Sequence, residues 1–143
     1  SKVCDPGSVE VLQHKELKTF TNVFHLVSSI KGKLSNNVSF SDVLKAVFPG
    51  GSITGCPKIA AMGYISNMEN HERSFYTGSF FIRFPQGNSM DSSILIRTAI
   101  KQDDIVHFQA GGGIVIDSDP EAEYQECLAK ASSFLKVLEG LNE

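Results

Sequence analysis

The chain of 143 residues lacks features that would indicate several common functional classes. Lys and Arg number 13 against 16 Asp and Glu, which gives a net charge of −3 and no basic surface for nucleic acid. No apolar run approaches the length of a membrane span, so we expect no membrane partner. The length and a hydrophobic content of 41% suffice in principle for one core.

Cysteine is also scarce. Cys4, Cys56 and Cys127 are an odd number of thiols without CxxC spacing. This pattern disfavours a disulfide framework or a zinc site and fits a reducing, cytoplasmic location. No signal peptide opens the chain. Residues 1–7 read as a turn without an initiator Met, so we interpret the sequence as beginning midway through a longer one.

The rest of the chain is organised around residues 48–58, with the sequence FPGGSITGCPK. A helix is predicted to follow with Pro57 at its first position, because apolar residues recur at helical spacing over 59–68. A glycine-permitted loop before a helix N-terminus directs backbone N–H groups and the helix dipole toward an anion. The alternative is an ordinary loop in which Thr54 caps the helix. Cys56 and Pro57 after Gly55 exclude a nucleotide P-loop.

The strands and helices that the hydrophobic patterns predict indicate a fold of class α+β. A short helix is expected at 42–47, capped by Ser39 or Ser41. Asp103 and Asp104 predict a hairpin turn. Strands are predicted at residues 8–12, 20–34, 75–84, 92–100 and 105–110.

Three consecutive glycines, Gly111 to Gly113, interrupt a strand that would otherwise continue through 114–116. Glycine inside a strand indicates either a bulge or the close approach of another group to the backbone. Three glycines exceed what a bulge needs, which favours close approach.

The final helix is predicted to begin at Pro120, with Asp119 as its cap. Glu123, Glu126 and Lys130 then share one stripe at the edge of the apolar face, at spacings i, i+3 and i+7. Two neighbouring carboxylates repel unless a cation joins them. That cation is either Lys130, in a salt bridge, or a divalent metal such as magnesium, which prefers oxygen ligands.

Two further residues stand in apolar surroundings. Arg97 lies inside the predicted strand 92–100, where it either points to solvent or binds a substrate carboxylate through its two-pronged guanidinium. His25 lies in the predicted strand 20–34, as either a hydrogen-bonded structural residue or an acid–base group.

These features together resemble the chorismate-utilising enzymes over residues 3–138. Within that family, residues 49–55 (PGGSITG) are most similar to component I of aminodeoxychorismate synthase, which is also called p-aminobenzoate synthase. The alternative is component I of anthranilate synthase, in tryptophan biosynthesis. The blocks that occur in the family's order and spacing are residues 24–28, 48–55, 96–98, 109–115 and 117–123.

The resemblance implies a magnesium enzyme that aminates chorismate to 4-amino-4-deoxychorismate on the route to p-aminobenzoate and folate. Ammonia would come from a glutamine amidotransferase subunit, and the metal would hold the ring carboxylate while the C4 hydroxide leaves. The implied metal ligands are Glu123 and Glu126, and the implied catalytic residue is His25. The implied substrate-binding residues are Ser52, Thr54, Gly55, Tyr76, Arg97, Gly111, Gly113 and Lys130.

The resemblance also implies that residues 1–143 are the C-terminal part of a single chorismate-binding domain whose N-terminal part is absent. They would form half of that fold, with antiparallel sheets and outer helices. The family's lysine nucleophile motif and second acidic pair are missing, and Ala60 replaces an arginine. We therefore expect this chain alone to be inactive, or to be a non-catalytic binding fragment. Half-sheets would leave open edges, which predicts a homo-oligomer.

Overall fold

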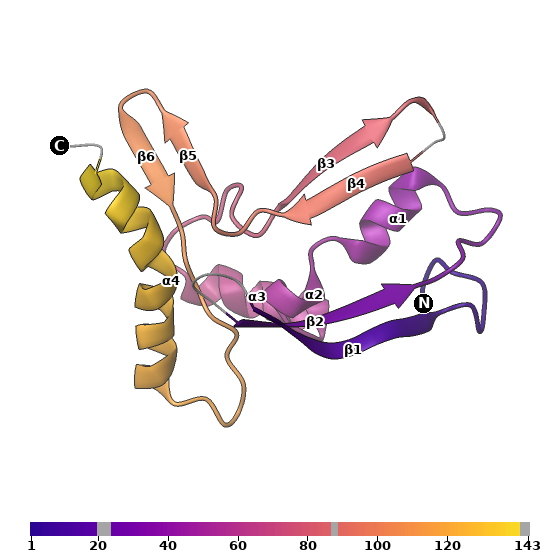
Figure 1. The fold of residues 1–143 in the computed structure, drawn as a ribbon, viewed down its shortest axis with the longest axis horizontal. Coiled ribbons are helices and arrows are strands. Elements are labelled where there is room, and N and C mark those ends of the chain that lie inside the picture. Colours follow the sequence, from indigo (N-terminus) through magenta and orange to yellow (C-terminus); the bar gives the residue numbers. More distant parts are fainter. Residues whose placement is uncertain (20–23, 87–88, 141–143) are drawn as a thin grey trace. The chain divides into compact units, whose positions relative to one another are not determined.

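The computed structural model describes residues 1–19, 24–86 and 89–140. The chain divides into two compact units, Ser1–Val47 and Phe48–Glu143. It contains both helices and antiparallel hairpins (Figure 1), which confirms the predicted α+β class. Among the described residues, no helix has both the length and the apolar character needed to cross a membrane.

The first unit is a hairpin followed by a short helix. Strand β1 (Glu10–Thr19) pairs antiparallel with β2 (Phe24–Lys31). β1 extends well beyond the predicted end at Leu12, and β2 ends before Leu34. The predicted residues 20–23 lie outside the described part of the chain.

Helix α1 (Phe40–Val47) begins two residues before its predicted start. Ser39 caps it, because Ser39 Oγ accepts the Asp42 N–H at 3.3 Å while Asp42 Oδ2 accepts the Ser39 N–H at 3.0 Å. This reciprocal arrangement satisfies two backbone donors at once, which fixes the helix start at Phe40.

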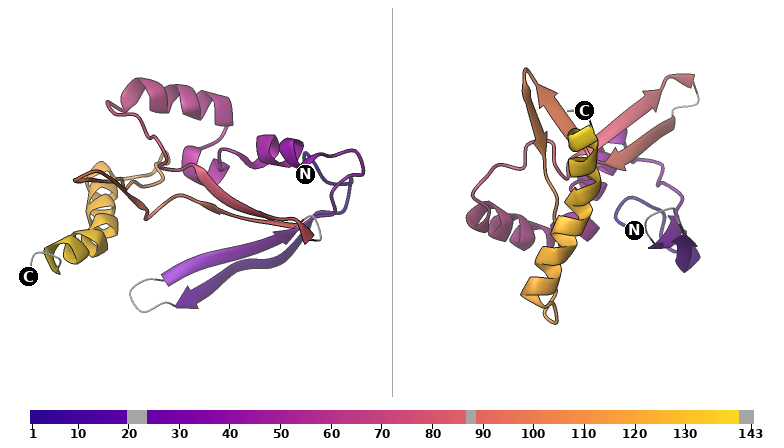
Figure 2. Two further views of the ribbon diagram at one scale, coloured as in Figure 1. Left: turned by 90° about the horizontal axis from the view of Figure 1, so that it is seen from above. Right: turned by 60° about the vertical axis from the view of Figure 1, so that its left-hand side comes forward.

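The second unit contains three helices and two hairpins (Figure 2). Every sheet in the described residues has only two strands, so the outer edges of each hairpin have no strand partner there. The elements are α2 (Gly51–Thr54), α3 (Lys58–Met68), β3 (Ser79–Phe84) paired with β4 (Ser89–Ile94), β5 (Ala99–Gln102) paired with β6 (Ile105–Phe108), and α4 (Pro120–Gly140).

The predicted strand 92–100 is not continuous, because β4 ends at Ile94 and β5 begins only at Ala99. Leu95 leaves the ladder: its N–H donates to Gly78 O and its carbonyl accepts the Thr77 N–H, each at 2.9 Å. Arg97 therefore lies in an exposed link with φ 52°, not inside a strand. The predicted strand 75–84 likewise begins only at Ser79.

Residues 114–116 also form no strand, and Ile116 is 99% exposed. β6 stops at Phe108, before the glycine run begins and short of the predicted end at Ala110, and the chain continues irregularly to α4. The predicted hairpin turn at Asp103 and Asp104 is confirmed, with Asp103 at φ 54°.

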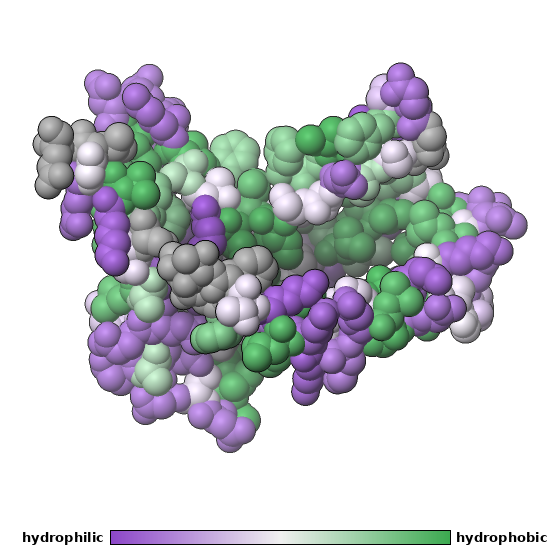
Figure 3. Space-filling view, viewed as in Figure 1, coloured by the Kyte–Doolittle hydropathy of each residue, from purple (hydrophilic) through white to green (hydrophobic). Residues whose placement is uncertain are grey.

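The described residues contain no buried apolar side chain, so the core expected from length and composition is not formed. Their one buried residue is Thr77, at 7% exposure. Apolar side chains gather instead on the surface of β3 and β4 (Figure 3), where Phe80 is 56% and Phe84 is 40% exposed. Apolar surface of this extent is typical of a face that other protein covers.

Candidate active site

The glycine run contacts two other segments at close range. A Cβ atom on Gly111 would lie 2.8 Å from the Tyr76 hydroxyl oxygen, and one on Gly112 would lie 2.9 Å from Glu123 Oε2. A side chain at either glycine would force the neighbouring group to shift, so the close-approach interpretation holds for these two glycines. Gly113 has open space around its Cβ direction.

Three contacts hold the segment before and within the glycine run. Gln109 Nε2 donates to the Glu72 carbonyl at 3.3 Å, and Lys130 Nζ donates to the Gly111 carbonyl at 3.2 Å. The rings of Phe108 and Phe134 stack with centroids 4.3 Å apart. The run is therefore fixed between α4 and the turn that precedes β3.

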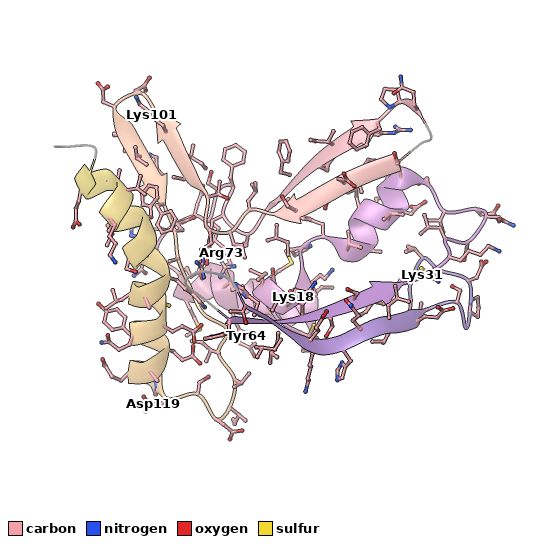
Figure 4. The ribbon with its side chains drawn as sticks, in the orientation of Figure 1. Lys18, Lys31, Tyr64, Arg73, Lys101 and Asp119 are labelled. Atoms are coloured by element: carbon pink, nitrogen blue, oxygen red, sulfur yellow. The ribbon has the colours of Figure 1, made fainter. Side chains whose placement is uncertain are left out.

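Helix α4 begins as predicted. Asp119 Oδ1 accepts the Ala122 N–H at 2.9 Å, and Pro120 is the first helical residue. Asp119 is labelled at this helix start in Figure 4. The cap fixes the first turn of α4 and thereby the direction in which the Glu123 side chain points from the helix.

Replacing Asp119 by Ala is expected to loosen that first turn. Losing an N-cap costs about 1 kcal/mol, so the Ala122 amide should exchange with solvent roughly fivefold faster. Amide hydrogen exchange followed by NMR measures this, with Asp117→Ala as the matched control. Equal exchange rates in the two variants would contradict the cap.

Glu123 is the most constrained carboxylate of this region. Its Oε1 accepts the Ser118 hydroxyl at 2.5 Å, and Ser118 Oγ in turn accepts the Val115 N–H at 3.0 Å. Its Oε2 is buried and has no hydrogen-bond partner among the described residues. A buried carboxylate oxygen without a donor is costly unless a cation or donor reaches it.

Glu126 and Lys130 form the salt bridge that was one of the two predicted arrangements. The hydrogen bond from Lys130 lowers the pKa of Glu126, which is therefore ionised at neutral pH. The Glu126 side chain is 54% exposed and that of Lys130 is 26% exposed. Lys130 thus connects the glycine run, through Gly111, with the second carboxylate of the pair.

The donor set fits magnesium as a partial site. Glu123 offers a buried free oxygen, and Glu126 offers an ionised carboxylate one turn along the helix. The described residues contain no group of three or more His, Cys, Asp or Glu side chains able to hold a metal ion. Two carboxylates with water are a normal magnesium supply, so the pair would be one side of a fuller shell.

Tyr76 faces the glycine run from the turn that precedes β3. Burial raises the pKa of Tyr76, while the nearby Arg73 opposes that shift. The phenol therefore keeps its proton at neutral pH and is able to donate a hydrogen bond. A donor at this position suits a carboxylate placed beside Gly111.

The structure brings Tyr76, Glu123, Glu126 and Lys130 together at the glycine run. The exposed Arg97 lies on another segment of the same unit and makes none of the contacts described above. His25 belongs to the first unit, on the exposed face of β2 opposite Lys18, and its catalytic role stays a prediction.

Residues 48–58, where an anion-binding loop was expected, contain one helical turn, α2, which includes Ser52 and Thr54. Pro57 precedes α3 as its cap residue instead of taking its first position. No side chain caps α3, so the alternative role of Thr54 was wrong. Gly55 has φ 110°, a conformation that favours glycine.

Sequence reasoning missed several residues of this site. The predicted site includes Gly113 but not Gly112, and it does not include Ser118. Glu69 and Arg73 form an ion pair in the non-helical segment after α3, where the helical i, i+4 rule gives no signal. For Ser118 the available signal was a hydroxyl directly before the helix cap.

Comparison with known proteins decides the family. The model of the family described as chorismate binding enzyme matches residues 1–136. The chain belongs to this family of chorismate-binding enzymes. It is 43% identical over 139 residues to anthranilate synthase component 1 of Aquifex aeolicus, covering 96% of this chain and 28% of that protein.

The relatives carry two different activities in their names. Aminodeoxychorismate synthase component 1 of Salmonella typhimurium is also 43% identical over 139 residues, covering 96% of this chain and 30% of that protein. The crystal structure of anthranilate synthase component I from Streptococcus pneumoniae matches with a TM-score of 0.84 and 39% identity. That match covers 92% of this chain and 30% of the solved one. The chain thus spans under a third of these relatives, and its fold is part of the chorismate-binding fold.

Proposed function

We propose that this chain supplies substrate-binding and metal-binding groups to an enzyme that aminates chorismate to 4-amino-4-deoxychorismate. Membership of the chorismate-binding family and the PGGSITG stretch support this reaction. The observation that carries the proposal is Glu123 Oε2, which is buried without a partner beside Gly112. The product would lead to p-aminobenzoate and folate, with ammonia delivered by a glutamine amidotransferase subunit.

The chain's own groups account for carboxylate binding. Lys130 holds the Gly111 carbonyl, and in a trans peptide the following N–H, that of Gly112, points the opposite way. A substrate carboxylate would accept from this N–H and from the protonated Tyr76 hydroxyl. Arg97 would add a charge-assisted, two-pronged contact.

Glu123 and Glu126 would hold magnesium. When bound, the metal would neutralise a chorismate carboxylate and assist departure of the C4 hydroxide. Glu126 would then exchange its Lys130 partner for the cation, and Lys130 would keep its bond to Gly111. Ser118 would hold the other oxygen of Glu123 in place during this exchange.

Anthranilate synthesis is the second candidate, because relatives of both names match this chain at equal identity. Chorismate binding without turnover is a third, non-catalytic candidate. The test uses the polypeptide encoded at this locus with any adjoining coding sequence, supplied with chorismate, magnesium and ammonium. Chromatography that finds 4-amino-4-deoxychorismate supports the proposal, anthranilate replaces it with the second candidate, and binding without product supports the third.

Changing Arg97 to Lys is expected to weaken chorismate binding by roughly ten- to a hundredfold, because the charge remains but the fork is lost. One charge-assisted hydrogen bond contributes about 1.5–3 kcal/mol. Isothermal titration in the same complete polypeptide measures the affinity, with Arg83→Lys on β3 as control. Equal affinity in both variants would show that Arg97 only points to solvent.

A further inference from the structure

The turn that carries Tyr76 is held in a backbone conformation that side chains rarely adopt. Ser74 has φ 50° and Thr77 has φ 62°, although neither is glycine. A left-handed residue with a Cβ costs roughly 1–2 kcal/mol. Such costs persist only where the surroundings fix the backbone, and they gather at functional sites.

Backbone hydrogen bonds fix part of this turn. The Tyr76 N–H donates to the Arg73 carbonyl at 2.8 Å, and the Gly78 N–H donates to the Phe75 carbonyl at 2.9 Å. The two bonds between this turn and Leu95 anchor it to the segment after β4. These bonds orient the backbone and leave the Tyr76 ring itself to be placed by side chains.

The Arg73 side chain connects the end of α3 with Tyr76. Its Nε donates to Glu69 Oε2 at 2.7 Å and its Nη2 to Glu69 Oε1 at 2.5 Å, a two-pronged pair. Its Nη1 donates to Thr77 Oγ1 at 3.3 Å, and that hydroxyl donates to the Tyr76 carbonyl at 2.6 Å. The guanidinium carbon lies 5.6 Å from the centre of the Tyr76 ring.

The contacts of Arg73 suit it to a different role from the carboxylate binding proposed for Arg97. The charge of Arg73 is compensated by Glu69, its side chain is only 23% exposed, and all three of its nitrogens donate to protein. It has little capacity left for a substrate carboxylate. Figure 4 labels Arg73 in this turn.

We propose that Arg73, held by Glu69, is a positioning residue that keeps the Tyr76 hydroxyl against Gly111 and so sets the affinity of the site for a substrate carboxylate. The part that concerns the carboxylate rests on the proposed function. The Tyr76 hydroxyl lies so near Gly111 that a Cβ on this glycine would be 2.8 Å from it, and one of the two would have to shift. Arg73 restrains the ring from its face, and Thr77 restrains the backbone beneath it.

A double-mutant cycle tests this in the polypeptide encoded at this locus. Arg73→Gln is expected to weaken chorismate affinity roughly tenfold, about the effect of one hydrogen bond to a charged group. In a Tyr76→Phe background, which lacks the hydroxyl, the same change should have almost no effect. Equal losses in both backgrounds would overturn the proposal, because Arg73 would then act independently of Tyr76. Arg83→Gln on β3 is the control.

A second readout needs no chorismate. The difference in ultraviolet absorbance between the protein and its Tyr76→Phe variant follows the titration of Tyr76 alone. Arg73 lowers the pKa of Tyr76 against the effect of burial, and Lys130 acts in the same direction, whereas Cys127 and Glu69 raise it. Arg73→Gln should therefore move that pKa further above 10.0, its ordinary value.

A fall toward the ordinary value would mean that the turn had opened, and an unchanged pKa would mean that Arg73 does not face the ring. The unchanged value would overturn the proposal. If the turn opens in Arg73→Gln, the same double-mutant cycle is repeated with two milder variants. Arg73→Lys keeps the charge, and Glu69→Gln keeps a polar side chain in place. A raised pKa in a protein that binds no chorismate would refute the proposed function and support the placement of Tyr76.

Discussion

Changing Glu126 to Gln should reduce chorismate turnover by about a hundredfold or more and weaken its dependence on magnesium. The estimate follows from the tenfold to hundredfold losses that even residues supporting a metal ligand produce. The change is nearly isosteric and its side chain is largely exposed, so the fold should survive. Isothermal titration of magnesium and initial rates in the complete polypeptide measure the two effects.

The Glu126 carboxylate has two candidate roles, as the salt-bridge partner of Lys130 or as a ligand of magnesium. Lys130 already occupies Glu126 and lowers its pKa, so the salt bridge alone accounts for an ionised Glu126. A depressed pKa keeps the carboxylate charged above its ordinary value of 4.5, and the pairing is lost only as the pH falls through the lowered value. The pair is therefore intact throughout the neutral range in which magnesium would compete for it.

The matched control is Glu139→Gln, the same chemical change near the other end of α4. If Glu126 serves only Lys130, both variants will bind magnesium and turn over chorismate alike, and the metal proposal fails. If Glu126 is a ligand, only its own variant loses affinity. Lys130 would still donate to Gly111 in that variant, so the carboxylate-binding face should remain.

Local signals predicted the start of α4 and its cap well. A cap residue, a proline and a periodic apolar face all agreed on a start at Pro120, and each acts within a few residues of it. The glycine run was also a readable signal, since three consecutive glycines exceed what a bulge needs and so favour close approach. What the sequence did not show was which glycine meets which group, because that depends on the helix and the turn arriving from elsewhere.

Long-range hydrogen bonds explain where the strand predictions failed. Leu95 stands in an apolar run that favours a strand, but it bonds to Thr77 and Gly78, some seventeen residues earlier in the chain. That pairing ends β4 and displaces Arg97 into a link. The aromatic run from Phe75 likewise suggested a strand, whereas Arg73 and the left-handed Thr77 hold its first residues in a turn.

The absent hydrophobic core leads to the prediction with the largest consequence. Residues 1–143 alone are expected neither to turn over chorismate nor to bind it tightly. The described residues contain no group of three or more side chains able to hold a metal ion, and they bury no apolar side chain. A partial metal shell and an open site leave substrate carboxylates competing with water, where electrostatic contacts are weak.

The same surface predicts association. Every described sheet has two strands with open edges, and apolar side chains of β3 lie 40–56% exposed. Open edges pair with other strands, and exposed apolar faces bind other protein. Purified residues 1–143 should therefore form dimers or larger assemblies, which light scattering detects.

Supplying the part of a relative that this chain does not match should reverse both properties. The matched segment of the Salmonella typhimurium relative covers 30% of that protein, so its other residues can be expressed as a separate chain. Mixing that chain with residues 1–143 is expected to give a defined complex and to restore chorismate turnover, because the shared core would then form. The same chain mixed with the Glu126→Gln variant is the control and should give the complex without the activity. A stable monomer of residues 1–143 that turns over chorismate unaided would refute this account and would direct attention to Lys31, Lys58 and Lys130 as nucleophiles.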